Sequence, residues 1–159
     1  RELAEGFFGW VSYTLMRSER KDHPDTGWRL FDYDQTHVLT LLASDDLGKG
    51  WQIGARFRYA TGSPRTPVIG AFLSATRRDL YEPIFGAHNS IRIPAFVQGD
   101  ARLSKSFQLG WGKAEAYLDV QNITNRANPE EIVYDYRYRT RKYITGLPIL
   151  PVVGARIEW

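Results

Sequence analysis

Apolar and polar residues alternate along six segments of this chain, and a period of two predicts β-strands with one apolar face and one polar face. The pattern is clearest at the end of the chain, where every second residue is apolar: Val153, Ala155, Ile157 and Trp159. Glycine and charged residues lie between them. The predicted strands are 7–16, 36–44, 51–60, 95–107, 113–122 and the last one, within 148–159.

Aromatic residues lie at the ends of two of these apolar faces. In segment 51–60, Trp51 and Tyr59 lie at opposite ends with smaller residues toward the middle, the order of a strand that crosses a bilayer between two aromatic belts. The chain ends on Trp159, whereas the terminus of a soluble protein is usually polar. By itself, the last strand fits a membrane interface and an ordinary sheet equally well.

Long and short connections alternate between the predicted strands. The long ones span 17–34, 61–94 and 123–147, and the short ones span 45–50 and 108–112. If neighbouring strands pair antiparallel, all long connections lie at one end of the sheet. We expect 61–94, which contains several prolines and glycines, to be irregular. In 123–147, an alternating run from Ile132 predicts a hairpin.

Strand length and connection length together favour a membrane protein. Several strands have about ten residues, more than the five or six typical of soluble sheets and enough to cross a bilayer when tilted. We predict an all-β fold, an antiparallel up-and-down transmembrane β-barrel segment of about six strands. Membrane barrels need about eight strands or more to close, so the chain should form one arc of a larger barrel.

Polar and charged side chains fall opposite the apolar faces. A basic side chain facing lipid at mid-depth would cost about 2–4 kcal/mol, so we predict that these residues face the barrel lumen. Ion pairs with the lumen contents are favoured over substrate binding as their role. The predicted lumen-facing residues are Arg56, Arg58, Gln98, Asp100, Arg102, Asp119 and Arg156. The last strand should turn Val153, Ala155, Ile157 and Trp159 to lipid.

Composition removes several other classes of protein. The chain has 159 residues, 43% of them hydrophobic and 14% aromatic, and it contains no cysteine, which excludes disulfides and thiolate chemistry. The net charge of +3 is spread over interspersed charges of both signs, so nucleic-acid binding is not indicated. No apolar run approaches a spanning helix. The first residue is Arg1, so we expect a processed, truncated or partial chain.

Five stretches resemble the C-terminal strands of TonB-dependent outer-membrane receptors. They are RLFDYDQTHVLTL (29–41), WQIGARFRYATGSPRTPV (51–68), FVQGDARLSKSF (96–107), AYLDVQNITNRANP (116–129) and GLPILPVVGARIEW (146–159). Three motifs are together fairly specific for this family. They are DQxH at the start of a strand, GxxxTP after another strand, and LDVxNxxNR. The resemblance covers nearly the whole chain, so residues 1–159 are expected to be the C-terminal part of such a receptor.

The resemblance implies a 22-stranded barrel in the bacterial outer membrane, with a plugged lumen. Such a receptor imports a scarce nutrient (a siderophore, cobalamin, oligosaccharide or peptide) with energy passed on by TonB. Its implied partners are lipid, the remaining barrel strands, the plug, and the assembly machinery that reads an aromatic C-terminal residue. The chain contains neither the plug nor the TonB-coupling segment, and the resemblance implies no cofactor and no enzyme activity.

Aromatic and basic residues in two of the long connections are candidates for ligand contacts by stacking and charge. The alternative, which we favour, is that their hairpin packs on neighbouring loops. These residues are Tyr81, Tyr134, Tyr136, Arg137, Tyr138 and Arg139. Asn122, Asn125 and Arg126 should end a strand and form a turn.

Two other classes of function stay open. One is a soluble β-sandwich binding module with exposed aromatic residues, and the other is an outer-membrane enzyme barrel. No nucleophile motif marks an enzyme. Asp32, Asp34 and His37 are the nearest approach to a metal site, but aspartates at a junction between loop and strand commonly form turns.

Overall fold

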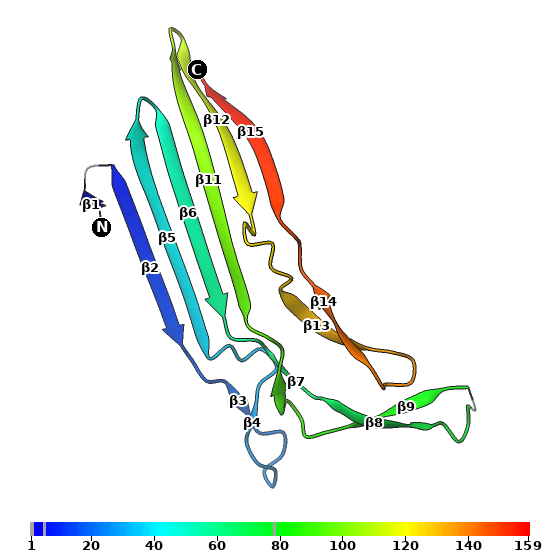
Figure 1. Cartoon of the computed structure of the whole chain (residues 1–159). Coiled ribbons are helices and arrows are strands. Elements are labelled where there is room, and N and C mark those ends of the chain that lie inside the picture. Colours follow the sequence, from blue (N-terminus) through cyan, green and yellow to red (C-terminus); the bar gives the residue numbers. More distant parts are fainter. Residues whose placement is uncertain (1, 5, 78) are drawn as a thin grey trace.

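The computed structural model describes residues 2–4, 6–77 and 79–159, and it is all-β, with 61% of residues in strands. A main sheet of seven strands is antiparallel throughout and has the order β1-β2-β5-β6-β11-β12-β15 (Figure 1). Its strands are β1 (Glu2–Ala4), β2 (Phe7–Leu15), β5 (His37–Gly48), β6 (Trp51–Ala60), β11 (Phe96–Leu109), β12 (Gly112–Gln121) and β15 (Leu150–Glu158).

All six predicted strands are therefore confirmed, with shifted ends. β5 extends to Gly48 and β11 extends to Leu109, so the two short turns are tighter than predicted. At the first of them, Lys49 has a φ of 52° and Gly50 a φ of 80°, a left-handed geometry that allows a two-residue reversal. β1 was not predicted, and three residues are too few to show a period.

The prediction that 61–94 is irregular was wrong. The long connections hold small two-stranded sheets, and the longer strands within 61–94 contain the β-branched and aromatic residues that favour strands. The pairs are β3 (Glu19–Arg20) with β4 (Arg29–Leu30), β7 (Pro64–Arg65) with β10 (Ile91–Arg92), β8 (Val68–Leu73) with β9 (Tyr81–Phe85), and β13 (Pro129–Tyr134) with β14 (Arg141–Thr145). The last of these is the hairpin that the run from Ile132 predicted.

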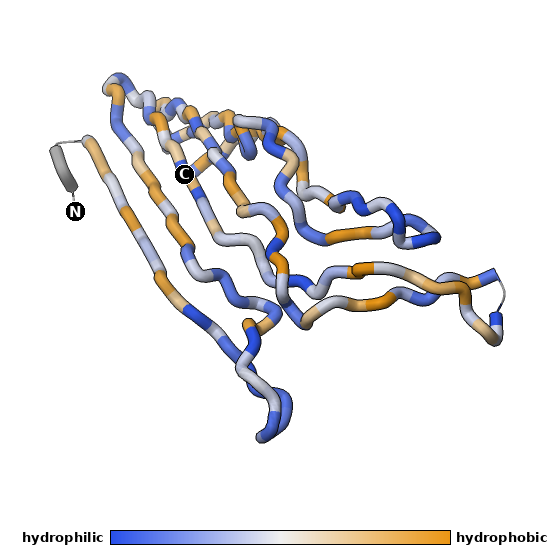
Figure 2. The backbone as a smooth tube through the Cα atoms, turned by 60° about the horizontal axis from the view of Figure 1, so that its bottom comes forward, coloured by the Kyte–Doolittle hydropathy of each residue, from blue (hydrophilic) through white to orange (hydrophobic). Residues whose placement is uncertain are grey.

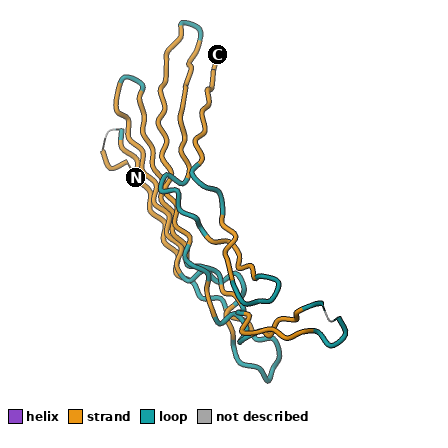
Figure 3. The backbone as a smooth tube through the Cα atoms, turned by 45° about the vertical axis from the view of Figure 1, so that its right-hand side comes forward, coloured by secondary structure: helices purple, strands orange, loops and turns teal. Residues whose placement is uncertain are grey.

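All three long connections lie at one end of the main sheet, which we call the loop end, and the tight turns lie at the other, the turn end (Figures 1 and 3). Within the described residues the sheet does not close, since β1 and β15 lie at its two edges. No helix among these residues is long and apolar enough to cross a membrane.

The main sheet is a single layer without a conventional core. Among the described side chains, Ile93 is the one hydrophobic residue that is buried. Large apolar residues of the strands are instead exposed, including Val11 (69%), Val153 (81%) and Trp159 (94%). A soluble sheet would cover one face with a second layer, so these exposures identify a face that needs a partner.

The register gathers most apolar positions on one face, while Phe8, Trp10 and Leu42 lie on the opposite face near the β2 edge. Residues directly opposite in an antiparallel pair share a face, and hydrophobic and hydrophilic positions are interspersed along the strands (Figure 2). One row across the apolar face consists of Gly9, Ala43, Ala55, Ala101 and Val120, and its neighbours include Val11, Leu41, Phe57 and Gly99. The apolar face is thus continuous from β2 to β15.

Replacing Gly50 with alanine should destabilise the tight turn between β5 and β6. A Cβ atom at Gly50 would lie 2.5 Å from the carbonyl oxygen of Ser106, and a left-handed φ alone costs an L-residue about 1–2 kcal/mol. We expect Gly50→Ala to lower the free energy of unfolding by about 2 kcal/mol or more, measured by urea titration of tryptophan fluorescence. Gly27→Ala is the matched control, because nothing lies within 4 Å of its Cβ position. Equal stability of the two variants would contradict this account.

Candidate functional site

The seven residues predicted to face a lumen all lie on the polar face of the main sheet, opposite the apolar face. Arg56 on β6 and Asp100 on β11 are direct cross-strand partners. The Arg56 guanidinium donates two hydrogen bonds to Asp100 Oδ2, at 2.6 and 2.8 Å. The other carboxylate oxygen accepts from the Gln98 amide at 2.7 Å and from the Asn122 backbone N–H at 2.9 Å. Asp100 is therefore fully bonded and buried in the middle of this face.

The other predicted lumen-facing cations of the polar face make different contacts. Arg102 lies 4.0 Å from the ring centroid of Tyr117 and pairs with Glu115 at 3.2 Å. Arg156 pairs with Glu158 at 2.5 Å. Arg58 lies 5.2 Å from the Phe96 ring, and within the described residues it pairs with no carboxylate. Arg56, Arg102 and Arg156 thus pair with carboxylates of the polar face itself.

A groove of about 730 Å³ lies on the polar face near the loop end. Trp10 and Phe96 supply its aromatic walls, Arg56 and Arg58 its cations, and Glu130 its acidic side. The groove can accept a segment or ligand that carries both apolar and anionic groups. The groove therefore lies between the long connections and the remainder of the polar face.

A buried ion pair joins the first long connection to the second. Arg92 pairs with Asp34, whose side chain is fully buried. Asp34 also accepts hydrogen bonds from the Ser18 backbone N–H at 2.6 Å and the Thr36 hydroxyl at 3.1 Å. Burial opposes ionisation of Asp34, but the hydrogen bonds from Arg92, Ser18 and Thr36 outweigh it and hold the pKa of this carboxyl below its ordinary value.

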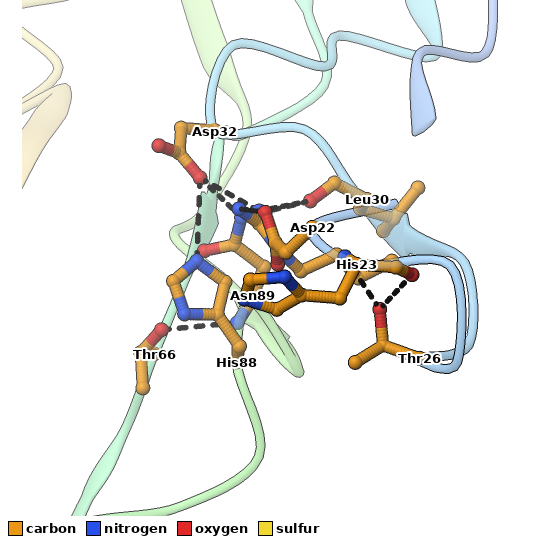
Figure 4. A network of polar contacts seen from close by, with 9 residues as sticks. Asp22, His23, Thr26, Leu30, Asp32, Thr66, His88 and Asn89 are labelled. Carbon is orange, nitrogen blue, oxygen red and sulfur yellow. Dashed lines mark hydrogen bonds and ion pairs between the residues drawn. The ribbon is translucent and has the colours of Figure 1, made fainter. Parts of the chain in front are cut away.

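Asn89 forms a second junction between the same two connections (Figure 4). Its amide donates to the carbonyl of Leu30 at 2.8 Å and to Asp32 at 2.5 Å, and its backbone N–H donates to the Thr66 hydroxyl at 3.0 Å. The Asn89 hydrogen bond lowers the pKa of Asp32 against the opposing effect of burial, with the nearby charge of Arg29 adding to the lowering.

In the described part of the chain, no three acidic or histidine residues gather as metal ligands.

The third long connection is joined to the second by a bidentate ion pair. Arg65 donates to both carboxylate oxygens of Glu131, at 2.9 and 3.0 Å, and this bond lowers the pKa of Glu131 against the opposing effect of burial. The Tyr134 hydroxyl accepts from the Val68 backbone N–H at 3.1 Å. The three connections therefore form one linked cluster.

The predicted ligand-contacting residues meet where the β8–β9 and β13–β14 hairpins approach each other. Tyr81 packs edge-on against Tyr136, with ring centroids 5.7 Å apart, and the Arg137 guanidinium lies 6.0 Å from the Tyr81 ring. Tyr134 and Tyr138 lie 6.0 Å apart. Arg139 is exposed beyond them. These contacts are the loop packing that we favoured, while Tyr136 and both arginines keep exposed surface for a ligand.

Asparagines end the strands at the loop end, as expected. Asn122 and Asn125 have φ values of 51° and 48°, which asparagine tolerates better than most residues. The Asn122 amide donates to the carbonyls of Arg126 and Leu147. Asn128, which sequence reasoning missed, pairs its side chain with both backbone groups of Val97 at 2.9 Å. Its position one residue before Pro129 was the available signal.

The apolar face carries aromatic residues toward both ends. Trp51, Phe107 and Trp159 lie toward the turn end, and Tyr13 and Tyr59 lie toward the loop end. Val153, Ala155, Ile157 and Trp159 are all exposed on the edge strand or directly after it. This pattern resembles the paired aromatic girdles of membrane barrels.

No protein-family model, curated protein or solved structure matches the chain. Its function is therefore inferred from the two faces of the sheet and the cluster of loops.

Replacing Asp34 with asparagine should uncouple the first two connections. The variant leaves the Arg92 cation without its partner, and breaking a buried pair costs about 3 kcal/mol. Because the pKa of Asp34 is lowered in the folded protein, its contribution is present above the ordinary carboxyl pKa and is lost as the pH falls through the folded value. We expect the urea midpoint of the parent to fall on acidification, and that of Asp34→Asn to start lower and fall less. Asp25→Asn, at an exposed site on the same connection, should behave like the parent. Identical pH profiles for parent and Asp34→Asn would contradict the assignment.

Proposed function

We propose that the chain forms part of the wall of a TonB-dependent receptor in the bacterial outer membrane, which imports a scarce nutrient. One observation carries the proposal: a single antiparallel layer has one continuous apolar face and a charged opposite face. Contiguous exposed apolar surface on this scale is rare in soluble monomers. Lipid covers the apolar face, and the lumen receives the charged face.

A soluble β-sandwich would bury the same apolar face under a second sheet. Its strands would divide between two layers, whereas here all long strands form a single sheet in up-and-down order. The small sheets of the loops lie beyond the loop end rather than over the apolar face (Figures 1 and 3). The arrangement therefore favours the membrane barrel over the sandwich.

The two sheet edges call for further strands. An unpaired backbone group in hydrocarbon costs several kcal/mol, so the edges formed by β1, β2 and β15 pair with the remaining strands of the barrel. The charged face then meets the plug, with Arg58 and the neighbouring groove available to an acidic or mixed segment. TonB acts through the plug, outside this arc.

The loop end is the side that meets the ligand. Long loops of outer-membrane barrels are extracellular and short turns are periplasmic, which assigns the linked loops to the cell exterior. Exposed Tyr136, Arg137 and Arg139 there contact the ligand by stacking and charge. The ligand classes compatible with the resemblance are a siderophore, cobalamin, an oligosaccharide or a peptide.

Neighbouring residues of β6 test the assignment of the two faces. Phe57→Cys and Arg58→Cys, each carrying a nitroxide, differ by one position on one strand and point to opposite faces. In the membrane-embedded protein, we expect oxygen to relax the label at Phe57 more than a water-soluble nickel chelate does, and the reverse at Arg58. Equal exposure of both labels to the chelate, in protein that stays soluble without detergent, would favour the sandwich.

Sidedness is tested with thiol labelling of intact cells. This chain has no cysteine, so single cysteines can be introduced at Lys142 in the loop end and at Gln108 near the turn end, with labelling of the parent protein as the background. We expect an impermeant maleimide to label Lys142→Cys in intact cells, and Gln108→Cys only after permeabilisation. Labelling of Gln108→Cys alone in intact cells would reverse the proposed orientation.

A further inference from the structure

One cation breaks the pattern of the apolar face. Lys105 on β11 lies in the same row as Trp51 on β6 and Ala116 on β12. In the paired strands that the structure describes, it is the one lysine or arginine on this face; the other charged residue is Asp45, two strands away. Both charges lie near the turn end.

The Lys105 ammonium is held between aromatic rings. Its Nζ lies 5.0 Å from the Trp51 ring centroid and 5.8 Å from that of Phe107. It donates to the backbone carbonyl of Lys49 in the adjacent turn. An ammonium has three donors, and no carboxylate of the described residues pairs with it. Lys105 therefore presents a positive charge with unused donors beside two partly exposed aromatic side chains.

Small side chains lie next to this cation on the apolar face. Ala116 lies opposite Lys105, and Ala155 lies opposite Ala116 on β15. On one side, the next row consists of the larger residues Leu103, Leu118 and Val153. On the other side, Ala114 lies between Phe107 and Ile157 and extends the patch of small side chains along β12. Ala116 and Ala155 lie on adjacent strands about 4.8 Å apart. Because their side chains are shorter than those of Leu118, Val153 and Ile157, we call this low apolar patch beside Lys105 the trough.

Given the membrane orientation proposed above, on which this inference rests, we propose that Lys105 binds the phosphate of a phospholipid in the leaflet at the turn end, with Trp51 and Phe107 against the glycerol region of that lipid. The acyl chain of that lipid lies in the trough over Ala116 and Ala155. A lysine on a lipid-facing surface extends its ammonium toward the headgroups, and a phosphate accepts the donors that Lys49 leaves unused.

Charge complementarity and position select this occupant. The cation of the site matches a phosphate, and the two aromatic rings match the interfacial glycerol region. The apolar trough matches an acyl chain. An acidic peptide would gain from the cation but would leave its backbone groups unpaired in the hydrocarbon beside the alanines. A free phosphate would gain nothing from the trough.

Native mass spectrometry of the intact membrane-extracted protein tests the site, with phosphatidylglycerol and phosphatidylethanolamine titrated as probes. We expect Lys105→Gln to weaken binding of the most tightly held lipid about fivefold, the effect of one basic residue at a lipid surface, and Lys105→Arg to restore most of it. Lys113→Gln is the matched control, because Lys113 lies at the same end on the polar face opposite Glu158. Inorganic phosphate should not compete.

A second measurement does not depend on removing the lysine. A photoreactive side chain at Ala116 should capture a phospholipid in membranes, and one at Tyr117, on the opposite face, should not. Equal lipid loss in the Lys105→Gln and Lys113→Gln variants, competition by inorganic phosphate, or equal capture at both positions would overturn the lipid site while leaving the barrel intact. Failure of the protein to reside in membranes would instead overturn the proposed function itself.

Discussion

The central constraint on this chain is that a single antiparallel sheet satisfies its backbone between strands but leaves both faces to be covered. Seven strands pair in one layer, and buried apolar packing is almost absent from the described residues. Stability must therefore come from what lies against each face. The apolar face calls for an apolar partner, and the charged face calls for a polar one; in the proposed receptor these are lipid and the lumen contents. Every functional assignment above depends on this division.

At the loop end, ion pairs and hydrogen bonds between the connections stabilise the structure in place of buried apolar side chains. Asp34 with Arg92 joins the first connection to the second, and Arg65 with Glu131 joins the second to the third. The first pair is buried on its acidic side and the second is more exposed. The loops are consequently linked in series, which presents Tyr136 and Arg137 on a supported surface rather than on an isolated hairpin.

The two ends of the sheet divide the proposed work. In the proposed receptor, the long linked loops meet the ligand, while the tight turns and the aromatic residues near them lie at the opposite membrane interface. Lys105 fits this division, since a cation is tolerated on a lipid-facing surface only where it can reach headgroups. Arg56 and Asp100, at mid-strand, lie on the other face and bond to each other instead. A charged residue is therefore tolerated according to its position along the strand and the face of the sheet on which its side chain lies.

Strands and faces were predictable from sequence because their signal is local: a period of two assigns Arg58 and Val153 to opposite kinds of surface without reference to the rest of the fold. The chain order of long and short connections likewise predicted the two ends. The pairings Asp34–Arg92, Arg65–Glu131 and Tyr81–Tyr136 were not predictable, since they join residues more than fifty positions apart and depend on how hairpins fold back. Only the tertiary structure decided these contacts and placed Lys105 beside Trp51, because cross-strand register sets which distant side chains become neighbours.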